Sequence, residues 1–144
     1  NRTDVLMLPR AMKPNDTLIL QTVAETDLAL SRWADFVGRD QFFELGRDPD
    51  VLSRMEEELE RLNRRVGELG KQMKMGRTPM PQAMGYFAAR GELQKTTELL
   101  RDIRHRNQGS VRQTARFLSQ AEACRHTLQE WAALVQRTSP TRLH

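Results

Sequence analysis

The middle of the chain carries an uninterrupted heptad stripe of apolar residues. Seven such residues follow one another at alternating spacings of three and four positions. An apolar repeat with this mean period is typical of an α-helix that packs along its whole length against other helices. The heptad stripe consists of Leu52, Met55, Leu59, Leu62, Val66, Leu69 and Met73. It predicts an all-α fold and constrains the architecture much more than the chemistry.

Helix-breaking and capping residues divide the chain into four helical segments. Asp48 suits an N-cap and Pro49 the first helical position that follows it, while Ser110 suits a second N-cap. Similar lengths and short connections predict an antiparallel four-helix bundle. A continuous helix through Gly109 would instead give long helical hairpins with coiled-coil-like packing. We expect helices over residues 17–37, 49–75, 82–108 and 110–137.

The length and composition indicate one domain. The chain has 144 residues, of which 38% are hydrophobic and 29% charged, so it can form a core. Pro9 and Pro14 would interrupt a helix, which predicts an irregular arm over residues 1–16. The bundle domain is expected over 17–137, and a loose tail over 138–144.

The residues that flank the heptad stripe indicate whether it pairs with a second copy. With Leu52 at position a, a parallel homodimer would place Glu58 opposite Asn63. Arg65 would meet Gly70, so neither pair is an attractive ion pair. The other helical segments also carry apolar stripes that need partners. We therefore favour burial within the same chain, and a homo-oligomer stays open.

Composition also bears on the class of protein. The net charge of +4 allows an anionic partner without requiring one. Cys124 is the only cysteine, so a disulfide within the chain and a cysteine zinc cluster are excluded. We expect its thiol inside a helical core as a small hydrophobic group, and a cytoplasmic location. No stretch approaches the roughly 18 apolar residues that cross a membrane, so a membrane partner is not expected.

No arrangement typical of an enzyme is present. The sequence lacks a phosphate-binding glycine loop and the histidine spacing of a metal site. Glu57 and Glu60, with Glu98 and Asp102, resemble the paired carboxylates with which helical nucleotide pyrophosphatases hold magnesium. A solvated acidic face is the simpler interpretation. We expect no catalytic residue, no cofactor and no metal site.

The stretch 101–126 is rich in arginine and contains two acidic residues, Asp102 and Glu122. Guanidinium groups suit bidentate contacts to phosphates and carboxylates. The stretch therefore predicts a face for anions, nucleic acid or an acidic protein, with a solubilising face as the alternative. Its arginines are Arg101, Arg104, Arg106, Arg112, Arg116 and Arg125.

The segment from His105 to Ser110 resembles the phosphorylated motif of histidine phosphotransfer domains, which are small four-helix bundles. In that family a glycine follows the phosphorylated histidine at +4 and a small residue at +5, as Gly109 and Ser110 do here. The glycine clears space for an approaching receiver domain. Asn107 and Gln108 depart from the apolar residue and the lysine of the family. The resemblance implies phosphotransfer through His105, and a surface histidine near a helix end is the alternative.

A protein partner is the favoured interpretation of the remaining apolar residues. Methionine suits adaptable surfaces because its side chain is flexible and polarisable. Core packing competes for each residue, most clearly for Tyr86, which shares a heptad spacing with Ala89 and Leu93. The last two helical segments are rich in leucine and are separated by the polar break Asn107-Gln108-Gly109, and in this they distantly resemble flagellar and type III export chaperones. We expect a non-enzymatic adaptor, chaperone or assembly subunit, with nucleic-acid binding and phosphotransfer as alternatives. The candidate partner-binding residues are Val5, Leu6, Leu8, Phe42, Phe43, Met80, Tyr86 and Phe87.

Overall fold

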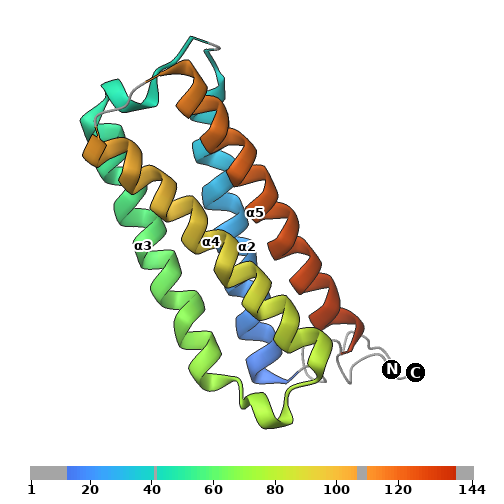
Figure 1. Cartoon of the computed structure of the whole chain (residues 1–144). Helices are drawn as coiled ribbons and strands as arrows, with labels where there is room; N and C mark the ends of the chain where they lie inside the picture. The colour runs from blue at the N-terminus through green and yellow to red at the C-terminus, as the bar shows by residue number, and fades with distance from the viewer. Residues whose placement is uncertain (1–12, 41, 107–109, 139–144) are drawn as a thin grey trace.

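The computed structural model describes residues 13–40, 42–106 and 110–138. Its described part contains four long α-helices, and successive helices run in opposite directions (Figure 1). The prediction of an all-α antiparallel four-helix bundle is confirmed. The long helices are α2 (Pro14–Gly38), α3 (Pro49–Gln72), α4 (Met80–Arg106) and α5 (Val111–Arg137), with short 3₁₀ helices η2 (Leu45–Arg47) and η3 (Met75–Arg77) between them.

The four helices close into a ring. α3 and α5 each pack against both α2 and α4, and the α4–α5 interface is the most extensive. The apolar faces meet inside this ring, which is why one continuous core runs the length of the bundle. All seven members of the heptad stripe are buried there. The stripe of α3 is thus covered by its own chain, as predicted.

The ends of α2 and α3 follow from prolines and caps. α2 begins at Pro14, three residues before the predicted start, because the fixed φ of proline suits the first helical position. The expectation that Pro14 belongs to an irregular arm is therefore wrong. The Asp48 side chain accepts a hydrogen bond from the backbone N–H of Val51 at 3.1 Å, which confirms the predicted cap. α3 ends at Gln72, three residues early, because Met73 has extended backbone angles.

The helical conformation is interrupted between α4 and α5. Ser110 has extended backbone angles (φ −148°, ψ 159°), and its side chain accepts a hydrogen bond from the N–H of Gln113 at 3.2 Å. The predicted N-cap is confirmed, and the alternative of one continuous helix is wrong. Gly109 lies outside the described residues. None of the helices described here has the length and apolar character needed to span a membrane.

A threonine of α5 holds the connection between α2 and α3 against the bundle. The backbone N–H of Leu45 donates to the Thr114 hydroxyl at 3.0 Å, and that hydroxyl donates to the carbonyl of Phe43 at 2.8 Å. These bonds satisfy backbone groups that burial removes from water. They also bring the fully buried Leu45 side chain onto the end of the core.

Candidate partner-binding surface on α4

The N-terminal half of α4 exposes three large apolar side chains along one face. Met80 is 71% exposed, Met84 63% and Phe87 59%. Their spacings of four and three residues place them on one side of the helix, over about 10 Å at a rise of 1.5 Å per residue. We call Met80, Met84 and Phe87 the α4 stripe. It faces away from the core that the other side of α4 supplies.

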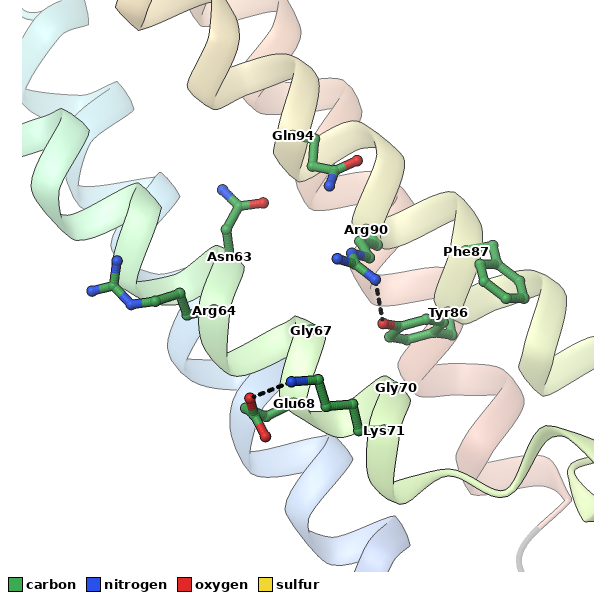
Figure 2. A pocket seen from close by; sticks show the side chains of 10 residues that line it. All are labelled: Asn63, Arg64, Gly67, Glu68, Gly70, Lys71, Tyr86, Phe87, Arg90 and Gln94. Carbon is green, nitrogen blue, oxygen red and sulfur yellow. Dashed lines mark hydrogen bonds and ion pairs between the residues drawn. The ribbon is translucent and has the colours of Figure 1, made fainter.

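The α4 stripe forms a ridge between two grooves. The α3–α4 groove has a volume of about 550 Å³, and Phe87 lies on its wall (Figure 2). The α4–α5 groove has a volume of about 520 Å³, and its lining includes Met84, Trp131 and Leu134. An apolar side chain of a partner can therefore contact the ridge and enter either hollow.

Glycines of α3 shape the floor of the α3–α4 groove. A Cβ atom at Gly70 would overlap the hydroxyl and ring of Tyr86, so only glycine allows this approach. The Arg90 side chain donates to the Tyr86 hydroxyl at 3.2 Å (Figure 2). The Arg90 guanidinium also lies across from Gly67, 3.6 Å from the position that a Cβ atom would take there. The floor is thus a tyrosine inserted against α3 with an arginine lying over it.

Tyr86 is a core residue rather than an exposed contact for a partner. It is 1% exposed, and its ring lies 5.5 Å from that of Trp131 in an edge-to-face arrangement. The prediction that Tyr86 contacts a partner at the surface is therefore wrong, because its heptad position on α4 places its side chain in the core. It supports Phe87, whose ring lies 5.2 Å away, from beneath.

The other candidate contacts are distributed over different parts of the chain. Met80 and Phe87 are exposed on the α4 stripe. Phe42 is 71% exposed, but it lies in the connection between α2 and α3, at the other end of the bundle (Figure 1). Phe43 is half-buried against Phe36, with ring centres 6.0 Å apart. Val5, Leu6 and Leu8 lie outside the described residues.

Positive charge borders the α3–α4 groove. Arg64 and Lys71 lie on α3, and Arg90 reaches over from α4. Glu68, the acidic residue among those lining the groove, pairs with Lys71 at 3.3 Å. Arg64 and Arg90 have no ion pair within the described ranges. The rim beside the α4 stripe therefore carries an excess of positive charge.

Two of the six predicted arginines are held by a buried carboxylate of α3. Arg104 donates to Glu56 at 2.8 Å, and Arg101 donates to Glu56 at 3.4 Å and to Glu60 at 2.8 Å. Burial opposes the ionisation of Glu56, whose side chain is 8% exposed. Hydrogen bonds and charge from both arginines outweigh it, so the pKa of Glu56 lies below its ordinary value.

The remaining arginines of this set do not gather into one face. Arg125 on α5 pairs with Asp27 of α2 at 2.9 Å, on another side of the bundle. Arg116 donates to the Gln113 side chain at 3.3 Å. Arg106 and Arg112 are exposed near the turn between α4 and α5. In the folded bundle, carboxylates of α2 and α3 pair with arginines of the stretch 101–126. These carboxylates lie outside that stretch of the sequence.

His105 and Cys124, the two candidate reactive side chains, are not placed in a reactive setting by the described residues. His105 is exposed in the last turn of α4, and the glycine that its resemblance needs lies outside the described residues. Cys124 is fully buried, and burial raises the pKa of its thiol to about 12. The expectation that this thiol serves as a small hydrophobic group is confirmed.

The acidic residues do not assemble a metal centre in the part of the chain that the structure describes. No group of three or more histidine, cysteine or acidic side chains lies close enough together there to hold an ion. Glu60, a candidate ligand, pairs instead with Arg101.

Comparison with known protein families, curated proteins and solved structures found no match to this chain. Function is therefore inferred from the geometry of the described residues.

Proposed function

We propose that this chain is a non-enzymatic helical adaptor or assembly subunit that binds another protein through the α4 stripe. The observation that supports it most is the alignment of Met80, Met84 and Phe87 on one face, each more than half exposed. Single exposed apolar residues are ordinary, whereas a contiguous patch indicates an interaction site. A cytoplasmic location belongs to the same proposal.

The exposure of the α4 stripe supports a role in binding a partner rather than in stabilising the fold. Its side chains contribute little to the core because most of their surface stays in water. A partner that buried the part of each side chain still in water would gain about 1–2 kcal/mol for each, because full burial of an exposed methionine or phenylalanine gains about 1.5–3 kcal/mol. A few such anchors supply most of the affinity in many interfaces. The adjoining grooves would accept the partner's own apolar side chains.

Nucleic-acid binding and phosphotransfer have weaker support. Arg101, Arg104 and Arg125 are engaged by carboxylates, which leaves fewer guanidinium groups for phosphate. Phosphotransfer depends on His105 alone among the described residues. Neither alternative explains why α4 exposes three aligned apolar side chains.

A site-specific cross-linking experiment tests the proposal. Benzoylphenylalanine at position 87 should form an adduct with one partner protein when cells that make the chain are irradiated. The same group at Leu28, which is 50% exposed on α2, is the matched control. α2 lies diagonally across the ring from α4, so the adduct should be absent there. Met84→Glu should remove the adduct at position 87 because it places a charge in the contact.

Two outcomes would contradict the proposal. Equal adducts at positions 28 and 87 would indicate non-specific labelling. An adduct at position 87 that survives Met84→Glu would indicate a partner that passes near position 87 without binding along the α4 stripe.

A further inference from the structure

The charges around Gly67 restrict what kind of partner segment the α4 stripe can bind. Arg64 lies three residues before Gly67 on α3 and Lys71 four residues after it, so both border the same face. Arg90 approaches the same point from α4, 3.6 Å from the position of a Cβ atom at Gly67. Cations of two helices therefore line the α3–α4 groove. Arg90 and Lys71 lie on the groove side of α3, and the Arg64 side chain extends outward from α3, away from Arg90 (Figure 2).

These cations are available to a partner. Arg64 is exposed and without an ion pair in the described ranges, and Arg90 bonds only to the neutral Tyr86 hydroxyl. Lys71 pairs with Glu68, but their side chains are 77% and 62% exposed. Such an exposed pair contributes little to stability and exchanges readily with other partners. A carboxylate from a partner would meet unneutralised guanidinium groups here.

The α4 stripe and the cations together require two kinds of group in the partner. The ridge of Met80, Met84 and Phe87 needs apolar side chains spaced over about 10 Å, which is two helical turns. The rim beside it needs negative charge. An amphipathic helix meets both needs, because residues at i, i+4 and i+7 form an apolar face with polar residues along its edge.

We infer that the α4 stripe binds an acidic amphipathic helix of a partner protein, with its carboxylates against Arg64, Lys71 and Arg90. This inference rests on the proposed function. The apolar side chains of the bound helix lie on the α4 stripe. The α4–α5 groove, lined by Pro81 and Leu134 among others, accepts an apolar side chain on the far side of the ridge.

A displayed library of random peptides tests this without knowledge of the natural partner. Peptides of about 16 residues, enough for four helical turns, are selected on the whole chain. They are then counter-selected on the double variant Met84→Ser with Phe87→Ser, which removes the apolar contacts without adding charge. We expect the enriched peptides to be net negative and to carry apolar residues at i, i+4 and i+7.

Charge reversal gives the quantitative readout. Arg64→Glu with Lys71→Glu should weaken binding of the enriched peptides at least about tenfold, and added salt should weaken binding to the unsubstituted chain. Arg32→Glu reverses an exposed arginine on α2 and should leave the affinity unchanged. Circular dichroism of each variant checks that the bundle is folded.

The failure of this inference and that of the proposed function give different results. Enriched peptides that need Phe87 but are neutral or basic, or that ignore Arg64→Glu with Lys71→Glu, would overturn the acidic helix and leave protein binding at α4 intact. If no peptide survives the counter-selection, protein binding by the α4 stripe is overturned as well.

Discussion

Replacing Trp131 with alanine should lower the free energy of unfolding by about 3–5 kcal/mol, as is usual for a large buried aromatic side chain. Trp131 is fully buried on α5, and its ring packs edge-to-face on Tyr86. Its indole N–H has no hydrogen-bond partner within the described residues, so the loss comes from packing and from the cavity left behind. Equilibrium denaturation in urea, followed by circular dichroism, measures the change.

The second tryptophan gives the matched control. Trp33 is half-buried on α2, and its indole N–H donates to Glu58 at 2.6 Å. Trp33→Ala should cost less than Trp131→Ala because less apolar surface leaves the core. The opposite order would contradict the placement of Trp131 in the buried core.

Replacing Gly70 with alanine should also destabilise the fold, by about 1–3 kcal/mol, although alanine is the better helix former. A Cβ atom at this position of α3 would overlap Tyr86. Tyr86 cannot move aside easily, because it is 1% exposed and packs against Trp131 and Phe87. Thermal and urea unfolding measure the loss.

Gly91→Ala is the control for helix propensity. Apart from the adjoining residues and backbone of α4 itself, no described atom lies within 4 Å of a Cβ atom built at Gly91, so this change should raise the free energy of unfolding by about 0.5–1 kcal/mol. In a Tyr86→Ala background the cost of Gly70→Ala should disappear, which isolates the contact. If Gly70→Ala stabilises the chain as Gly91→Ala does, Tyr86 does not lie against α3.

Most of the fold could be predicted because the apolar periodicity repeats over many turns. The heptad stripe identified α3 and its buried face, and the caps at Asp48 and Ser110 located helix starts. Helix ends were less certain, since proline both interrupts helices and begins them. Pro14 takes the second role. The turn after α3 comes three residues early because Met73 leaves the helical conformation while keeping its side chain in the core.

The candidate site was harder to predict from the sequence than the fold. Met80 and Phe87 were predicted as contacts, whereas Met84 was missed although it lies four residues after Met80. For Tyr86 the heptad spacing was the better guide, and it indicates the core. The carboxylates that engage the arginines could not be found locally. Glu56 precedes Arg101 by 45 residues, and only the packing of α3 on α4 brings them together.

The α4 stripe as a binding surface is tested most directly by methyl NMR of the whole chain labelled at its methionines. The probe is the tightest acidic peptide from the displayed library. Binding should shift the methyl signals of Met80 and Met84, while that of Met55, fully buried on α3, stays in place. If the peptide binds and the Met80 and Met84 signals do not move, the partner-binding surface lies elsewhere on the molecule.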